Sequence, residues 1–357
     1  MKTLRRYLAR EIMLATALVM AALLMLFAFF DLVEEIKDLG RGSYQLRHIV
    51  RHVVLSIPTH VYELFPIAAL IGTLFALAQL VANSEYTVMR TAGVSVTRMV
   101  LALMSVGLVF ALLTFVFGEY IGPFADQAAQ RQRSRAITGI VAQEFRSGLW
   151  MKDDTSFINV LEVTPEGNLK GVRIYEFDRD AKLRLFSFAQ RGTYQGERRW
   201  LLEDIVQTTF TDVRTTVGKI PSASWQSVLE PGLLSVLLIK PEKMSVASLY
   251  SYAQHLRENR QKTLRYEIAL WSKAAYPAAV LTMMLLALPF ANTQRRQGGV
   301  GAKIFTGIML GLAFYFLNRL SAFLGLLNEW PPAASGLMPT AVFLSIALTM
   351  IWWQERR

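Results

Sequence analysis

The stretch IMLATALVMAALLMLFAFF, residues Ile12–Phe30, decides the fold class of this chain. Its 19 residues carry no charge. At about 1.5 Å rise per residue, a helix of this length crosses a hydrocarbon core of about 30 Å. The stretch is longer than the apolar region of a signal peptide, and no small-residue cleavage site follows Phe30. We therefore expect a transmembrane helix that the protein retains.

Five further stretches have the length and apolar character of a membrane span, and only the fifth of the six spans contains a charge, Arg319. The six form two groups of three around a polar block of about 140 residues. We therefore divide the chain into a first transmembrane half (1–124), a polar domain (125–266) and a second transmembrane half (267–357). The five stretches are Leu64–Ala82, Met99–Gly118, Ala274–Asn292, Ile304–Leu327 and Ala333–Trp353.

The distribution of basic residues predicts the orientation, because Lys and Arg in short connections are retained on the cytoplasmic side. The two terminal tails and the loops after the second and fourth spans together hold 11 basic and three acidic residues. Both termini are thus expected in the cytoplasm and the polar block outside it. This asymmetry explains most of the net charge of +11, so nucleic-acid binding is not favoured. The absence of cysteine excludes disulfides and thiolate metal sites.

The polar block has the composition of a β-domain, since segments rich in β-branched and aromatic residues alternate with turn signals. Short strands at this spacing favour a sandwich or a barrel. After them, Ser245–Glu267 is predicted to be a helix that returns to the membrane, with Ser245 as its N-cap. Its apolar face would hold Leu249, Tyr252, Ala253 and Leu256. The predicted strands are Thr155–Val163, Gly171–Phe177, Leu183–Gln190 and Trp200–Val213.

No catalytic motif of the GxxxxGK[ST], HExxH or GxSxG kind is present, so we expect no catalytic residue, bound cofactor or metal. The glycines of residues 298–303 have the wrong spacing for a phosphate loop and suggest a flexible cytoplasmic turn. His48 and His52 lie four residues apart, as metal ligands on a helix do, but no third ligand is evident. An interfacial helix carrying Arg47 and Arg51 is the preferred interpretation.

Basic residues gather at the predicted outer ends of the first and third spans, where the positive-inside rule disfavours them. Three arginines alternate with other residues after the third span: Arg131, Arg133 and Arg135. If this segment is extended, all three side chains share one face. If it is helical, Arg133 points away from the other two. Arg319 lies near the outer leaflet, where it either snorkels or faces a cavity that takes an anionic headgroup. The neighbouring acids are interpreted as a solvated face paired with Lys37 and Arg41: Asp31, Glu34, Glu35 and Asp38.

The loop after the second span predicts a short helix of about two turns. Asn83, Ser84 and Glu85 can cap its start, and Gly93 can end it in the left-handed conformation. Its apolar stripe of Val88, Met89 and Ala92 either lies on the membrane surface or docks a cytoplasmic partner.

These features together resemble the permease subunits of lipopolysaccharide export transporters, the LptF/LptG family. The resemblance runs from end to end of the chain. It rests on the three-plus-three spans around a strand-rich block and on the order and spacing of four motifs. The motifs are Gly40–Tyr44 (GRGSY), Ser84-Glu85 with Val88-Met89 and Gly93, Gly148–Trp150 with Lys152-Asp153, and Trp271–Lys273 (WSK).

The resemblance implies an α-helical membrane protein of the Gram-negative inner membrane with an inserted, periplasmic β-jellyroll-like domain. It implies a heterodimer with an LptF-like permease, an LptB-like ATPase dimer that binds ATP and Mg, and an LptC-like periplasmic bridge component. The short helix would couple the ATPase to the spans, through positions that match Ser84, Glu85, Val88, Met89 and Gly93.

For the lipid phosphates, Lys37 and Arg133 match positions where the family carries basic residues. Asp31, Asp38 and Gln130 depart from that pattern. The predicted substrate ligands are Lys37, Arg41, Arg131, Arg133 and Arg319. The alternative function is a six-span membrane sensor or assembly scaffold whose exported domain binds a ligand or protein and which has no ATPase partner. A secondary transporter is disfavoured, because the spans show no repeated pair of broken helices or buried acids for ion coupling.

Overall fold

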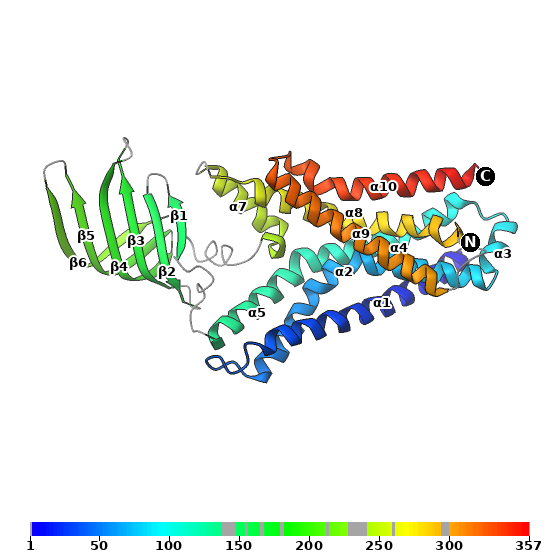
Figure 1. Ribbon diagram of the computed structural model, residues 1–357, viewed down its shortest axis with the longest axis horizontal. Helices are drawn as coiled ribbons and strands as arrows, with labels where there is room; N and C mark the ends of the chain where they lie inside the picture. Colours follow the sequence, from blue (N-terminus) through cyan, green and yellow to red (C-terminus); the bar gives the residue numbers. More distant parts are fainter. Residues whose placement is uncertain are drawn as a thin grey trace.

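A bundle of long helices and a curved β-sheet lie at opposite ends of the computed structural model (Figure 1). Both chain termini lie at the end of the bundle that faces away from the sheet (Figure 1). The structure describes residues 2–137, 148–153, 156–164, 168–178, 182–196, 198–211, 214–227, 241–258, 261–293 and 300–356.

Within the described residues, six helices are long and apolar enough to cross a membrane, which confirms the three-plus-three prediction. The third span continues from α4 through one π-helical turn, η1 (Phe117–Ile121), into α5. The helices are α1 (Lys2–Ile36), α2 (Leu46–Ala82), α4 (Val96–Val116) with α5 (Gly122–Ile137), α8 (Leu264–Thr293), α9 (Val300–Leu327) and α10 (Pro332–Glu355).

The helix α2 is the longest element, and at 37 residues it spans about 55 Å. It includes Arg47, His48, Arg51 and His52, so the helix predicted to carry Arg47 and Arg51 is present and is continuous with the second span. Hydropathy identifies only the apolar second half of α2, because the first half carries these polar side chains.

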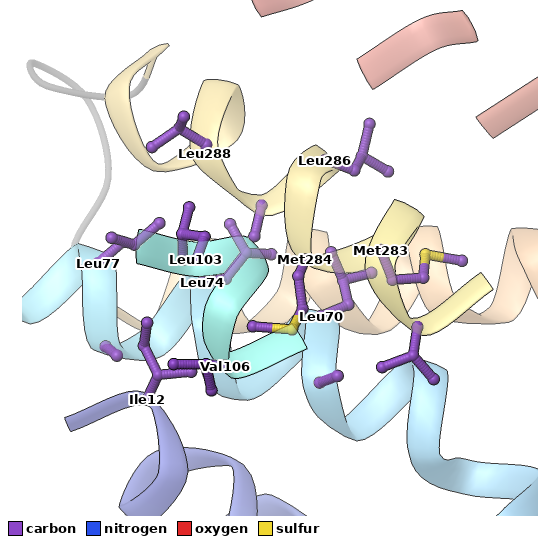
Figure 2. Close-up of a cluster of buried hydrophobic side chains, with 14 of the residues drawn as sticks. Ile12, Leu70, Leu74, Leu77, Leu103, Val106, Met283, Met284, Leu286 and Leu288 are labelled. Atoms are coloured by element: carbon purple, nitrogen blue, oxygen red, sulfur yellow. The ribbon is translucent and has the colours of Figure 1, made fainter. Parts of the chain in front are cut away.

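Interdigitated side chains from α1, α2, α4 and α8 form the centre of the bundle (Figure 2). Lipid tails are as apolar as leucine, so packing contacts rather than hydrophobic transfer hold such helices together. Gly72 of α2 lies against the backbone of Thr16 in α1, where any larger side chain would collide. The labelled core residues are Ile12 of α1; Leu70, Leu74 and Leu77 of α2; Leu103 and Val106 of α4; and Met283, Met284, Leu286 and Leu288 of α8.

The described part of the inserted domain is a six-stranded antiparallel sheet, which confirms an all-β block between the two helical halves. All four predicted strands are present, and β1 and β6 are additional. Each described strand pairs with its neighbours in sequence, which is the order of a meander and not the Greek-key order of a jellyroll. One face packs around the fully buried Trp200. The strands are β1 (Leu149–Asp153), β2 (Ser156–Val163), β3 (Leu169–Phe177), β4 (Leu183–Gly196), β5 (Arg199–Phe210) and β6 (Thr215–Gln226).

The chain returns from the sheet through the short helix η2 (Pro241–Lys243) and α7 (Val246–Glu258). Ser245 caps α7 as predicted, with its hydroxyl accepting from the backbone N–H of Ser248. The four residues of the predicted apolar face are buried. The predicted extent to Glu267 is wrong, since α7 ends at Glu258 and Glu267 already belongs to α8. The carboxylate of Glu119 in η1 accepts from the backbone N–H groups of Val246 (2.7 Å) and Ala247 (3.1 Å).

Candidate functional site

The predicted substrate ligand Arg133 forms ion pairs within the protein. Its Nε lies 3.1 Å from a carboxylate oxygen of Glu35, and a terminal guanidinium nitrogen contacts Asp38. The Glu35 side chain is only 10% exposed and also accepts a hydrogen bond of 2.6 Å from the Tyr44 hydroxyl. The interpretation of these acids as a solvated face is therefore wrong for Glu35, which joins α1 to α5.

Two histidines of α2 complete this cluster. His60 Nε2 lies 2.6 Å from Asp31, and His52 Nε2 lies 3.6 Å from Glu35. Burial, together with the hydrogen bond to Glu35, raises the pKa of the Tyr44 phenol above its usual range. In the part of the chain that the structure describes, no group of three His, Cys, Asp or Glu residues is arranged to hold a metal ion.

The Gly40–Tyr44 stretch holds this cluster in place, and its conformation depends on Gly40, which has φ +85°. The Gly40 N–H donates to the carbonyl of Tyr44 (3.0 Å), which closes the turn between α1 and α2. Both the backbone N–H and the hydroxyl of Ser43 donate to the carbonyl of Ala136 in α5, at 2.8 and 3.1 Å. The outer ends of α1, α2 and α5 are thereby joined through backbone as well as charge.

The other predicted ligands at this end are exposed. Residues 131–137 are helical, so Arg131 and Arg133 point in different directions. The side chain of Arg135 lies outside the described residues. Of the turn predicted at 298–303, residues 298 and 299 also lie outside them, and the prediction is wrong for residues 300–303, which belong to the first turn of α9. The Arg131 guanidinium donates to the side-chain carbonyl oxygen of Gln127, one turn earlier in the same helix, at 3.5 Å. Arg41 pairs with Asp38 but stays 68% exposed. Lys37 is also exposed.

Arg319 is placed apart from these residues, on α9, where it lines a cavity of about 520 Å³ between α2, α8 and α9. Its guanidinium lies 5.6 Å from the centre of the Tyr315 ring. The cavity also contains Glu63 and Lys273, neither of which we predicted as a site residue. Lys273 belongs to the Trp271–Lys273 motif, and this motif was the sequence feature that could have identified it as a site residue. Glu63 offered no such feature, because it lies in the part of α2 that hydropathy does not identify.

The short helix predicted after the second span is present as α3 (Glu85–Thr91), at the same end of the bundle as the termini (Figure 1). Gly93 ends it with φ +85°, as predicted. The Ser84 side chain makes no capping hydrogen bond, so the predicted cap is wrong there; Ser84 instead takes the left-handed conformation, φ 62°. Glu85 lies in the first turn, where the helix dipole favours an acid.

Side chains connect α3 to α1 and to the bundle. The Tyr7 hydroxyl in α1 donates to the Glu85 carboxylate at 2.9 Å. Tyr86 is buried and Met89 packs against the core, whereas Val88 is 64% exposed. The apolar stripe is therefore split between the bundle and an outer face that remains open for a partner.

The family described as “Lipopolysaccharide export system permease LptF/LptG” matches residues 6–353 of this chain. The chain belongs to the LptF/LptG permease family. The LptG protein of Haemophilus influenzae is 32% identical over 352 residues, which cover 98% of this chain and 97% of that protein. The LptG protein of Escherichia coli K12 is 30% identical over 350 residues, with the same coverage. The LptF protein of the latter organism is 21% identical over 368 residues, 98% of this chain and 94% of LptF.

The resemblance to the LptF/LptG permeases is thus confirmed, and the chain is a multi-pass membrane protein. Within the family, the Gly40–Tyr44 stretch favours the LptG branch, and the higher identity to the LptG proteins agrees with it. Family membership assigns no role to individual residues, so the coupling and substrate-binding roles stay predictions.

Proposed function

We propose that this LptF/LptG permease is one of two membrane subunits of an ABC transporter that extracts lipopolysaccharide from the inner membrane. It passes the lipid to a periplasmic bridge towards the outer membrane, driven by ATP hydrolysis in a partner subunit. The observation that carries the proposal is the family match along almost the whole chain. The placement of α3 and the sheet at opposite ends of the bundle supports it (Figure 1).

The partners in this proposal are an LptF-like permease, an LptB-like ATPase dimer and an LptC-like bridge component. Large apolar side chains on α1 and α9 are exposed, and we assign these faces to the acyl chains and to the second permease; examples are Leu18, Met25, Phe316 and Phe323. Each methylene of an acyl chain buried there contributes about 0.8 kcal/mol, so closing the cavity between the permeases would drive the lipid towards an apolar acceptor.

The four predicted ligands other than Arg319 divide into two groups in this mechanism. The exposed cations Lys37, Arg41 and Arg131 at the outer end of the bundle are free to approach lipid phosphates. Arg133 is already neutralised by Glu35 and Asp38, so we assign it the role of positioning α1 against α5.

Energy enters at α3, whose exposed face at Val88 would dock on the ATPase, and ATP and Mg bind to that partner. The hydrogen bond between Tyr7 and Glu85 connects α3 to α1, while α2 leads directly into α3. A displacement of α3 when the ATPase dimer closes therefore reaches two spans of this chain.

The first test uses the assembled transporter with Glu85→Ala, which we expect to reduce lipopolysaccharide-stimulated ATP hydrolysis while protein levels stay intact. Tyr7→Phe removes only the hydroxyl that donates to Glu85 and is expected to act in the same direction, less strongly. Tyr250→Phe is the matched control, because Tyr250 is 63% exposed on α7, near the sheet. Wild-type stimulation in Glu85→Ala would disprove the coupling role.

The second test discriminates against the sensor or scaffold alternative. The tagged chain is purified in a mild detergent, and co-purifying proteins and lipids are identified by mass spectrometry. An ATPase dimer, a second permease and lipopolysaccharide are expected. A solitary chain, under conditions in which a known membrane complex stays assembled, would favour the alternative.

A further inference from the structure

The cavity between α2, α8 and α9 has a mixed charge. Its volume of about 520 Å³ lies in the range of small-molecule sites. Its lining includes the acids Glu63 and Glu242 and the bases Arg265, Lys273 and Arg319, and the remaining wall is mainly aromatic and aliphatic. A ligand of one charge sign would therefore be repelled by part of the lining, whereas a ligand with both signs would find opposite charges for each.

The cavity lies at the level of lipid headgroups. Glu63 is 19 residues from the α3 end of α2 at Ala82, and Arg319 is 18 residues from Gly301 at the start of the fifth span. At about 1.5 Å per residue, both lie nearly 30 Å from that end, which is the thickness of the hydrocarbon core. The charged groups of the cavity thus meet the outer interface of the bilayer.

Two polar side chains of the cavity lining already form hydrogen bonds within the protein. Lys273 donates to the carbonyl of Met244 and is buried. The Tyr276 hydroxyl donates to the backbone carbonyl of Glu63 at 2.6 Å, next to Pro66, whose ring interrupts the hydrogen bonding of α2. These contacts fix the backbone around Glu63 and leave its carboxylate directed at the cavity.

Glu63 and Arg319 carry opposite charges and line the same cavity without contacting each other as an ion pair. Among the described residues, neither the carboxylate of Glu63 nor the guanidinium of Arg319 forms an ion pair. Charged side chains within membrane-spanning segments are costly unless they meet a partner or a polar cavity, and they mark binding sites for that reason. A ligand that brings one cation and one anion would complete both.

We propose that this cavity binds a zwitterionic phosphoethanolamine headgroup, with the phosphate at Arg319 and the primary ammonium at Glu63. The guanidinium matches phosphate oxygens in a bidentate geometry, and the ammonium donates to the carboxylate. The rings of Tyr62 and Tyr315 hold two cations of the lining in place, since Lys273 lies 5.2 Å and Arg319 5.6 Å from the respective ring centre. This group occurs on membrane phospholipids and on modified lipopolysaccharide. The inference goes beyond the transport function and does not depend on it, because it concerns binding alone.

The test is a titration of the full-length, delipidated chain in detergent, followed by native mass spectrometry. Phosphatidylethanolamine and phosphatidylglycerol with the same acyl chains are the probes. The wild-type chain is expected to prefer the ethanolamine lipid, and Glu63→Gln is expected to lower that preference about tenfold, since it removes a charged hydrogen-bond acceptor. Arg319→Gln should weaken binding of both lipids to a similar extent.

A second variant, Glu242→Gln, keeps the test decisive if Glu63→Gln does not fold, because Glu242 is exposed at the edge of the cavity. It should lower the preference in the same direction. Glu329→Gln is the control, an exposed acid at the end of α9 that does not line the cavity and should change nothing.

Lipid A with and without phosphoethanolamine distinguishes the two sources of the headgroup. If the chain prefers the modified form in the lipid A pair alone, the cavity is assigned to the exported lipid. If it prefers phosphatidylethanolamine in the phospholipid pair alone, the cavity is assigned to a membrane lipid. Either result supports the proposal. Absence of a preference in either pair, or an unchanged preference in both acid variants, would overturn it.

Discussion

Removing Arg133 tests whether this residue holds the outer ends of the helices together or binds substrate. Arg133→Ala eliminates two charge-assisted hydrogen bonds, to Glu35 and to Asp38, whose side chains are 10% and 14% exposed. Such bonds contribute about 1.5 kcal/mol each, so the expected loss of stability is about 3 kcal/mol. With about 2.1 cal/mol/K of unfolding entropy per residue over 357 residues, this corresponds to a decrease in Tm of about 4 °C.

The assay is thermal unfolding of the purified chain in detergent at one fixed scan rate, followed by tryptophan fluorescence. Arg131→Ala is the matched control, because Arg131 is exposed on the same helix. In a Glu35→Ala background the cost of Arg133→Ala should decrease to about 1.5 kcal/mol, since only the bond to Asp38 is then lost. An Arg133→Ala protein with the Tm of the Arg131 control, but with reduced lipopolysaccharide-stimulated ATPase activity in the complex, would refute the structural role and favour direct substrate contact.

Three further substitutions test other parts of the fold. Gly40→Ala should lower the free energy of unfolding by about 1–2 kcal/mol through its positive φ alone, because a Cβ there meets no atom within 4 Å. Gly218→Ala is the control, since Gly218 is equally open but has no positive φ, and it should not lower stability in this way. Equal Tm values for the two variants would contradict the argument. Glu119→Ala should accelerate exchange of the Val246 and Ala247 amides about tenfold, because it removes the carboxylate that accepts from them while the Ser245 cap stays in place. Unchanged protection of these two amides would exclude that role. Trp200→Ala should lower the free energy of unfolding by about 3–5 kcal/mol and make the sheet sensitive to protease, because Trp200 is fully buried. Trp150→Ala should do neither, because Trp150 is 52% exposed. Equal protease resistance of the two variants would contradict the assignment of the core.

The spans and the existence of an inserted β-domain could be predicted from the sequence because both depend on local patterns. Hydropathy identifies the part of each helix that lies in the membrane, but it does not detect the polar first half of α2. The strand β1 has only five residues, two of them charged, and β6 contains Gly218 and Pro221. An edge strand such as β6 tolerates proline, because one side of it makes no ladder hydrogen bonds. Its composition alone therefore does not predict a strand, and its pairing with β5 stabilises it.

The side-chain contacts of the candidate site could not be predicted, because they depend on which helices become neighbours. Arg133 and Glu35 are separated by 98 positions, and Tyr7 and Glu85 by 78. The sequence identified basic residues near the outer surface, but it did not indicate that Arg133 would be neutralised while Arg131 would remain exposed. The different directions of the two side chains follow from helical periodicity, which applies only because the structure shows this segment to be helical.

The length of α2 has a mechanical consequence. Its inner end leads directly into α3, and its outer end carries the His52 and His60 contacts to α1. A rigid rod of about 55 Å that rotates by about 5° about one end displaces the other end by about 5 Å. Pro58 and Pro66 lie along the rod between these ends, at positions where a helix bends most easily. In the proposed transporter, a straight α2 would therefore carry a small tilt at its α3 end to the opposite end as a displacement of about 5 Å, and bending at the two prolines would change that displacement.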